Sequence, residues 1–231
     1  MRAYVLCGGL GTRLRAVTHN GQKALVDVHG DPFLLLVLRQ LKLAGIDEVV
    51  LCAGYRADQL NDVLGSLSRR TELSLHLVVE EQPLGTGGAL LYALEQRPPN
   101  GSYLVLNADT YLTHEAFSLT SDGVNNLILA AQVDDRTRFG SLRLHDDGRV
   151  LALLEKGESG AGWVNAGVYC FTVDAMAQQV LRACSMEHEL LPALIDQHRL
   201  IAVPYRGPFI DIGTPEALAI FKKTSHWSTQ S

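Results

Sequence analysis

The chain reads Tyr4-Val5-Leu6-Cys7-Gly8-Gly9-Leu10-Gly11-Thr12-Arg13-Leu14 near its start, an apolar strand that runs directly into a glycine-rich turn. Glycine lets the backbone N–H groups of such a turn approach phosphate oxygens more closely than a residue with a Cβ would. Arg13 can donate two parallel hydrogen bonds to a phosphate, and Lys23 adds a point charge ten residues further on. The stretch matches neither the dinucleotide-binding pattern, because Leu14 stands where glycine is needed, nor the P-loop, because Gly-Lys-Ser/Thr is missing. It therefore predicts a phosphate site of another kind; the alternative is a tight turn with a surface arginine.

Strand and helix signals alternate from this turn through the first half of the chain. They predict strands over 4–7, 48–52, 75–79 and 103–107 and helices over 31–43, 57–67 and 86–96. Asp31-Pro32 supplies an N-cap and a first-turn proline for the first helix, and Ala44-Gly45 ends it. Strands that alternate with such helices imply a Rossmann-like, mostly parallel α/β sheet covered on both faces.

The second half of the chain has a different pattern. A hairpin over 141–145 and 149–154 turns at Asp146-Asp147-Gly148, and a strand over 164–171 follows. We expect helices over 174–184 and 187–198, strands over 200–204 and 208–212 that close the sheet, and a last helix from Thr214-Pro215 to 223. We predict a single domain over 1–225, with a nucleotide half (1–110), a partner-substrate half (111–225) and a frayed tail (226–231).

Composition indicates a folded, globular protein. Of 231 residues, 47% are hydrophobic and 19% charged, which is enough apolar material for a full core. The net charge of −5, without a basic patch, argues against nucleic acid as a partner. No stretch approaches 18 apolar residues, so we expect no membrane partner. The four cysteines are far apart and predict buried, reduced thiols, so we expect a cytoplasmic location. The sequence leaves a homo-oligomer open.

Two aspartates stand at the ends of predicted strands. Asp109 follows the strand over 103–107, and Asp211 ends a late strand just before a helix. Open α/β sheets bind ligands at the carboxyl ends of their strands, and magnesium takes few protein carboxylates beside phosphate oxygens. A turn-capping role for Asp109 and local amide bonding for Asp211 are the alternatives.

Several ordered motifs resemble the sugar-1-phosphate nucleotidyltransferases. They are Gly8 to Val28 with the glycine loop and Lys23, 83–89 (Pro-Leu-Gly-Thr-Gly-Gly-Ala), 106–110 (Leu-Asn-Ala-Asp-Thr), 138–140, Glu155-Lys156, 164–169 and 211–215. The resemblance covers nearly the whole chain and implies the single-domain, GT-A-like nucleotidyltransferase fold, without the C-terminal β-helix of larger relatives. Departures are Gln22 and Ala24, where the family usually has prolines around the lysine, Cys7 for an alanine, and Asn107-Ala108-Asp109 for a more common Gly-Asp.

The resemblance also implies roles for single residues. It implies catalytic roles for Arg13, Lys23 and Asp109, and a Mg²⁺ ion held by Asp109 and Asp211. It implies nucleotide binding by Leu6, Gly8, Gly9, Gly11, Thr12, Arg13, Glu80, Gln82, Gly85, Thr86 and Asn107. It implies sugar-phosphate binding by Gly140, Glu155, Lys156 and Asn165. The reaction would be an in-line attack of a sugar phosphate on the α-phosphorus of a nucleoside triphosphate, with release of pyrophosphate and no covalent protein intermediate.

The base and the sugar are predicted less directly. A carboxylate at Glu80 can accept both the N1–H and the exocyclic amine of guanine, whereas a glutamine amide suits a pyrimidine, so we favour GTP. Glu80 as the solvated end of a strand is the alternative. Within the family the chain looks most similar to D-glycero-α-D-manno-heptose 1-phosphate guanylyltransferases, which supply surface polysaccharides. N-acetylmuramate 1-phosphate uridylyltransferases and mannose 1-phosphate guanylyltransferases are the other readings.

Two further hypotheses compete with this one. A cytidylyl- or molybdopterin-type nucleotidyltransferase leaves Glu155-Lys156 and the motif at 211–215 unexplained. A catalytically silent nucleotide- or sugar-sensing module would not need every charge of Arg13, Lys23, Asp109 and Asp211. The eight histidines show no spacing typical of zinc sites.

Overall fold

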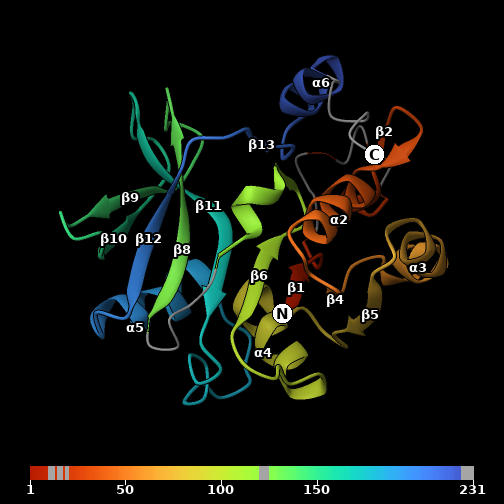
Figure 1. Ribbon diagram of the computed structural model, residues 1–231, viewed down its shortest axis with the longest axis horizontal. Helices are drawn as coiled ribbons and strands as arrows, with labels where there is room; N and C mark the ends of the chain where they lie inside the picture. Colours follow the sequence, from red (N-terminus) through yellow and green to blue (C-terminus); the bar gives the residue numbers. More distant parts are fainter. Residues whose placement is uncertain (10–13, 15–17, 19–20, 120–124, 225–231) are drawn as a thin grey trace.

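The computed structural model describes residues 1–9, 14, 18, 21–119 and 125–224. A mixed nine-stranded sheet runs through the molecule in the order β10-β9-β11-β6-β1-β4-β5, and β8 pairs with both β11 and β12 (Figure 1). Its parallel half consists of β1 (Arg2–Leu6), β4 (Glu48–Ala53), β5 (Ser74–Val79) and β6 (Tyr103–Asn107). The predicted α/β fold with a parallel central sheet is therefore confirmed.

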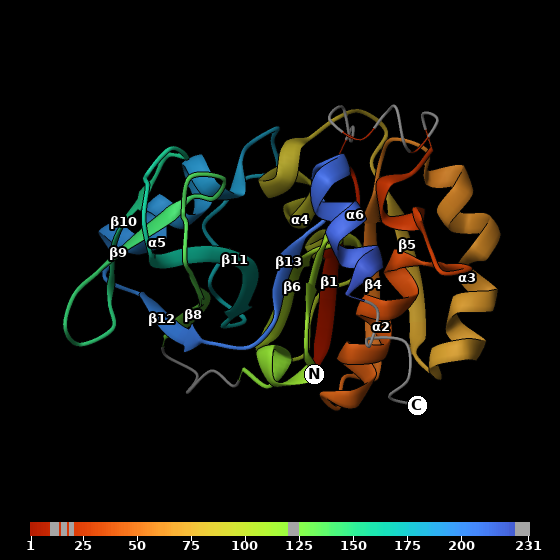
Figure 2. The same ribbon diagram turned by 90° about the horizontal axis from the view of Figure 1, so that it is seen from above.

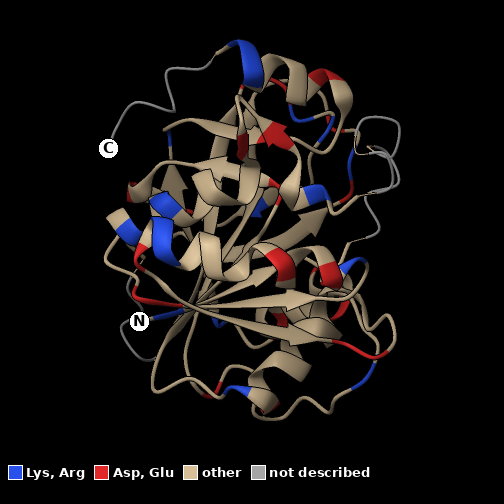
Figure 3. Cartoon of the chain, turned by 90° about the vertical axis from the view of Figure 1, so that its right-hand side faces the viewer, with Lys and Arg blue, Asp and Glu red and all other residues tan. Residues whose placement is uncertain are grey.

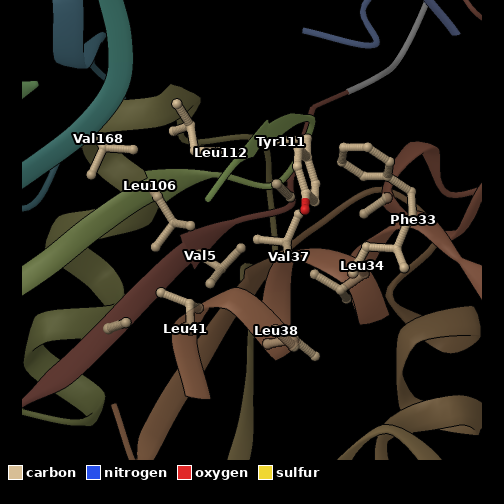
Figure 4. Packing of buried hydrophobic residues seen from close by; sticks show 14 of the residues in the cluster. Val5, Phe33, Leu34, Val37, Leu38, Leu41, Leu106, Tyr111, Leu112 and Val168 are labelled. Atoms are coloured by element: carbon tan, nitrogen blue, oxygen red, sulfur yellow. The ribbon is translucent and has the colours of Figure 1, made fainter. Parts of the chain in front are cut away.

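Helices cover both faces of the parallel half because alternate strand residues point to opposite sides. Val5 and Leu106 belong to one buried cluster with α2 (Phe33–Leu43) and α3 (Ala57–Thr71). The intervening residues Tyr4 and Val105 belong to a second cluster with α4 (Gly85–Gln96). Figure 4 shows Val37 and Leu41 of α2 packed against Val5 and Leu106. Strands buried on both faces explain the continuous apolar runs in the sequence.

The first long helix begins later than predicted. Asp31 and Pro32 form β3 (Asp31–Pro32), which pairs with β2 (Asp27–Val28), and α2 begins at Phe33 with no side-chain cap. The N-cap prediction for Asp31 is wrong because its carboxylate is engaged by Arg39 and Arg70 instead. The predicted end is confirmed, since Ala44 is the C-cap and Gly45 takes a φ of 81°.

An antiparallel half extends the sheet beyond β6. The central strand β11 (Gly162–Phe171) pairs with β6, with β9 (Ser141–Leu144) and with β8 (Asn126–Val133), which the sequence analysis did not predict. The hairpin of β9 and β10 (Val150–Leu154) is confirmed, and β12 (Leu200–Tyr205) runs parallel to β8. Figures 1 and 2 place this hairpin with α5 (Leu191–Asp196) at one end of the molecule and α3 at the other.

One helix prediction in the second half is wrong, and a second is confirmed only over 186–196. Residues 174–184 form turns, because Cys184 bonds to the start of α4: its N–H donates to Leu84 O, and its carbonyl accepts from the N–H groups of Gly87 (3.0 Å) and Gly88 (3.2 Å). The helix predicted over 187–198 is a π turn, η4 (Met186–Leu190), followed by the short α5. Pro192 lacks the N–H that would continue a single α-helix through this point.

The last strand does not close the main sheet as predicted. Instead β13 (Phe209–Asp211) pairs antiparallel with β7 (Thr110–Leu112) in a separate two-stranded sheet. The last helix α6 (Pro215–Lys223) is capped by Thr214, whose hydroxyl accepts from Ala217 N, as predicted. The short 3-10 turns are η2 (Lys23–Leu25) and η3 (His114–Phe117). The tail predicted over 226–231 lies outside the described residues.

Charge and cysteine placement agree with the composition. Figure 3 shows Lys and Arg interspersed with Asp and Glu over the side it presents. All four cysteines are buried, and none of them forms a disulfide. Among the described residues no helix is both long and apolar enough to cross a membrane.

Candidate active site

A pocket of about 390 Å³ opens at the carboxyl ends of the parallel strands β1 and β6. This is the edge of the sheet at which open α/β folds bind ligands. Nine of the residues predicted to act here line it: Leu6, Gly8, Gly9, Lys23, Glu80, Gly85, Thr86, Asn107 and Asp109. Gln82 is exposed and does not line the pocket. The predicted residues Gly11, Thr12 and Arg13 lie outside the described residues.

Lys23 and Asp109 meet inside this pocket although 86 residues separate them. Lys23 begins the turn η2, and Asp109 follows β6. The Nζ atom of Lys23 donates to Oδ2 of Asp109, and the two side chains are only 16% and 31% exposed. A paired, partly buried ammonium and carboxylate at the strand ends give the pocket both a cation for phosphate and a ligand for a metal.

Asp211 lies beside Asp109 because β13 pairs with β7. Thr110 is the register partner of Asp211, and Ile212 N donates to Asp109 O at 2.9 Å. Burial raises the pKa of Asp211, and repulsion from Asp109 raises it further, whereas Lys23, the Gly213 N–H and Lys156 lower it. Within the described parts of the chain, no group of three or more His, Cys, Asp or Glu could hold a metal ion. Asp109 and Asp211 are the two carboxylates that the pairing of β13 with β7 brings side by side.

Glu80 stands at the other side of the pocket, directly after β5. Its Oε2 accepts the Leu84 N–H at 3.1 Å, and its Oε1 lies so close to Gly54 that a Cβ there would overlap it. A Cβ on Gly8 would come within 3.2 Å of the same oxygen. Burial raises the pKa of Glu80, while the Leu84 hydrogen bond lowers it. Glycine at both positions leaves room for a carboxylate that one backbone bond orients.

The start of α4 forms one wall of the pocket and is fixed from outside. Gly85 takes a φ of 73°, and a Cβ there would stand 2.6 Å from the carbonyl oxygen of Cys184. The hydroxyl of Thr86 accepts the Met186 N–H at 3.0 Å. The segment before η4 therefore packs against the first turn of α4, which explains why this turn tolerates no side chain at Gly87 or Gly88.

A second pocket of about 400 Å³ lies against the hairpin β9–β10 and η4. All four residues predicted for the sugar phosphate, Gly140, Glu155, Lys156 and Asn165, line it. The sequence analysis missed Glu187 and His188 of η4, which line the same pocket. His188 Nδ1 lies 3.6 Å from Glu155 Oε1, and Asn165 Nδ2 donates to Tyr169 OH at 2.9 Å. No spacing signal marked Glu187 or His188, because their segment was predicted as an ordinary helix.

Asp211 links the two pockets electrostatically. Lys23 of the first pocket and Lys156 of the second both lower the pKa of Asp211, which itself lines neither pocket. The first pocket thus offers a paired lysine and aspartate, and the second offers a lysine beside carboxylates and an amide. Lys23 and Asp109 are in contact, the pairing of β13 with β7 places Asp211 next to Asp109, and Arg13 lies outside the described residues.

Comparison with known proteins agrees with this geometry. A family model described as Nucleotidyl transferase matches residues 2–226. The chain belongs to the nucleotidyl transferase family. Members with similar sequences include a mannose-1-phosphate guanylyltransferase catalytic subunit beta of Drosophila pseudoobscura pseudoobscura, 32% identical over 93% of this chain and 60% of that protein. A D-glycero-alpha-D-manno-heptose 1-phosphate guanylyltransferase of Campylobacter jejuni is 30% identical over 94% of this chain and 96% of that protein.

The crystal structure of HddC from Yersinia pseudotuberculosis is also similar to this chain. It has a TM-score of 0.86 and 32% identity, and the match covers 96% of this chain and 98% of HddC. HddC complexed with GMP-PN has a TM-score of 0.84 and 30% identity, with the same coverage. The chain spans about 60% of the length of the mannose-1-phosphate guanylyltransferases that it matches. The predicted resemblance to sugar-1-phosphate nucleotidyltransferases is confirmed at the level of the family.

Proposed function

We propose that the chain is a magnesium-dependent sugar-1-phosphate guanylyltransferase, which transfers GMP from GTP to a sugar 1-phosphate and releases pyrophosphate. The observation that carries the proposal is the pairing of Lys23 with Asp109 inside the first pocket, together with a second pocket lined by Glu155, Lys156 and Asn165. We assign the first pocket to the nucleotide and the second to the sugar phosphate. This assignment also divides the domain into a nucleotide half over 1–110 and a partner-substrate half over 111–225.

Guanine is the base that the first pocket fits. Glu80 has one oxygen bonded to Leu84 N and the other against Gly54 and Gly8, at the lining of the pocket. A carboxylate is an acceptor only, so it matches the two adjacent donors of guanine, N1–H and the exocyclic amine. The GMP-PN complex of HddC and the guanylyltransferase relatives support the same choice.

Asp109 and Asp211 fit a Mg²⁺ ion. Burial and the charge of Asp109 raise the pKa of Asp211, so the two ionised carboxylates repel each other. A bound divalent cation would offset this repulsion and stabilise both ionised forms. Magnesium prefers oxygen ligands and completes its shell with phosphate oxygens and water, so two aspartates suffice. When bound, Mg²⁺ supplies positive charge to the triphosphate.

The protein's own residues position the reactants and neutralise charge. Lys23, held at Asp109, supplies an ammonium near the α-phosphate, and Arg13 supplies a guanidinium for the departing pyrophosphate. Lys156 attracts the sugar phosphate toward the first pocket. The Glu155 carboxylate accepts hydrogen bonds from sugar hydroxyls, and the Asn165 amide donates to them. An oxygen of the sugar phosphate forms the new bond to the α-phosphorus as the bond to pyrophosphate breaks. A phosphate dianion is already a competent nucleophile, so orientation and electrostatics carry the rate.

Heptose 1-phosphate is the sugar substrate that we favour. The Campylobacter jejuni heptose enzyme is 30% identical over 94% of this chain, and HddC is similar to the chain in structure. Mannose 1-phosphate is the second candidate, because the mannose enzymes have comparable identity. We place the reaction in the cytoplasm, in keeping with four buried cysteines that form no disulfide.

Pyrophosphate release tests the proposal. The purified chain is mixed with Mg²⁺, each of GTP, UTP, dTTP and CTP, and the 1-phosphates of heptose, mannose, glucose and N-acetylmuramate. We expect fastest release with GTP and heptose 1-phosphate, and its loss on chelation of the metal. A sensing module would bind a nucleotide but release no pyrophosphate with any pair. A preference for UTP with N-acetylmuramate 1-phosphate would replace both substrates in the proposal.

A further inference from the structure

Gln22 is a buried glutamine at the first pocket, immediately before Lys23. Gln22 is 3% exposed, and both the nitrogen and the oxygen of its side-chain amide are hydrogen-bonded. The Nε2 group donates to the carbonyl of Cys7 at 2.7 Å and to that of Tyr55 at 3.4 Å. The Oε1 atom accepts the N–H of Ala24 at 3.2 Å. A buried amide with so many partners has one orientation, because any other would leave polar groups unpaired.

These hydrogen bonds join segments that are far apart in the sequence. Cys7 follows β1, Tyr55 lies in the turn between β4 and α3, and Ala24 belongs to η2. The backbone N–H of Gln22 is also held, since it donates to Oε1 of Gln59 in the first turns of α3 at 2.7 Å. The turn that carries Lys23 is therefore fixed to the ends of two parallel strands and to a helix.

Lys23 begins a short 3-10 turn in which Val26 N donates to its carbonyl at 3.2 Å. Relatives with prolines on either side of the lysine have a stiff turn, whereas this chain has Gln22 and Ala24 there. Gln22 nevertheless takes a φ of −65°, the value that proline would impose, and its amide bridges over Lys23 to the N–H of Ala24. The hydrogen bonds of Gln22 thus give the turn the order that prolines would give.

We propose that Gln22 is a positioning residue, which holds Lys23 at Asp109 and thereby at the α-phosphate. The proposal rests on the role of Lys23 in the proposed function. Gln22 acts on the reaction only through Lys23, and Gln59 supports it through the backbone bond. Misplacement of a catalytic group by about 1 Å can cost on the order of 100-fold in rate, so loss of this network has a measurable effect.

The test compares two buried glutamines. Gln22→Met keeps the volume and removes the polar atoms. Gln40→Met is the matched control: Gln40 is 9% exposed on α2, its Oε1 accepts the His114 N–H at 2.9 Å, and it lines neither pocket. We expect both variants to melt at lower temperature. Only Gln22→Met loses kcat, by about 10- to 100-fold, while Gln40→Met stays within about twofold, the change expected away from the site. Equal kcat values for the two variants would overturn the proposal.

A double-mutant cycle with Lys23→Ala separates this inference from the proposed function. If Gln22 acts through Lys23, Gln22→Met costs no further activity in the Lys23→Ala background. Additive losses would overturn the positioning role. Full activity of Lys23→Ala alone would refute the role of Lys23, whereas a loss there with an unaffected Gln22→Met would refute only the role of Gln22.

Hydrogen exchange gives a readout that needs no turnover. In the wild-type protein, the backbone N–H groups of residues 22 and 24 are both hydrogen-bonded within the network. We expect the Ala24 N–H to exchange faster in Gln22→Met, because its acceptor is gone, and to be unchanged in Gln40→Met. The same exchange rate in all three proteins would show that Gln22 does not order this turn.

Discussion

Glu80→Gln changes the residue that we assign to base recognition while keeping its shape. The amide retains an oxygen that can accept the Leu84 N–H, but it presents an N–H₂ group to the donors of guanine. Loss of one hydrogen bond to a charged group costs about 1.5–3 kcal/mol, or about 10- to 150-fold in kcat/KM for GTP. A pyrimidine accepts from an amide N–H₂, so we expect kcat/KM for UTP to change by less than about threefold.

The pH dependence of the same variant is a second signature. Burial raises the pKa of Glu80, and only the ionised form accepts both guanine donors. The wild-type kcat/KM for GTP is therefore present above this raised pKa and is lost as pH falls through it, and Glu80→Gln lacks that acid limb. Because the folded state raises the pKa, ionised Glu80 opposes folding at neutral pH. We therefore expect the neutral variant to melt no lower than wild type at pH 7.

Initial rates with GTP and UTP, measured from pH 4.5 to 8, check both statements. Glu81→Gln is the matched control, since Glu81 is the exposed neighbour and does not line the pocket. An equal loss for both nucleotides, or an acid limb that persists in Glu80→Gln, would remove Glu80 from base recognition.

Three further changes test other parts of the site. Asp109→Ala removes the proposed metal ligand, and we expect kcat to fall by at least about 100-fold. The melting temperature should move by only a few degrees, because a partly exposed ion pair contributes about 0–1 kcal/mol to the free energy of unfolding. A large fall in the melting temperature would instead favour a structural role for Asp109. Gly54→Ala places a Cβ against Glu80, and we expect it to lower kcat/KM for GTP more than for UTP. The control Gly65→Ala, on the exposed face of α3, leaves both kcat/KM values unchanged. An equal loss for both nucleotides in Gly54→Ala would contradict the assignment of Glu80. Because His188 lines only the second pocket, we expect His188→Ala to raise KM for the sugar 1-phosphate several-fold and to leave KM for GTP unchanged. Both constants are measured by varying each substrate in turn.

The parallel half of the fold was predictable because its signals are local. Each strand is a short apolar run, and each helix has its own start and end, such as Ala44-Gly45 for α2. The strand β8 was missed because the apolar run 127–131 has no period that separates a strand from a buried helix. The helix predicted over 174–184 does not form because Cys184 bonds to α4, a tertiary contact that no local pattern reports.

The candidate site was predictable where a motif fixes the residue and unpredictable where folding brings residues together. Lys23, Asp109 and Glu80 stand in recognisable motifs, and the pairing of β13 with β7 brings Asp211 to them. Gln82, from the same motif as Glu80, turns to solvent because the chain there leaves β5 for α4. The amide network of Gln22 joins three separate segments, so its role is visible only in three dimensions.

The most direct measurement is anomalous diffraction from crystals of the protein grown with Mn²⁺ and a non-hydrolysable GTP analogue. Manganese has the same preference for oxygen ligands as magnesium. It also scatters anomalously, so its position can be identified directly in an anomalous difference map. We expect one strong peak within coordination distance of both Asp109 and Asp211, with guanine at Glu80. A metal peak remote from both aspartates, with the nucleotide bound outside the first pocket, would contradict the account.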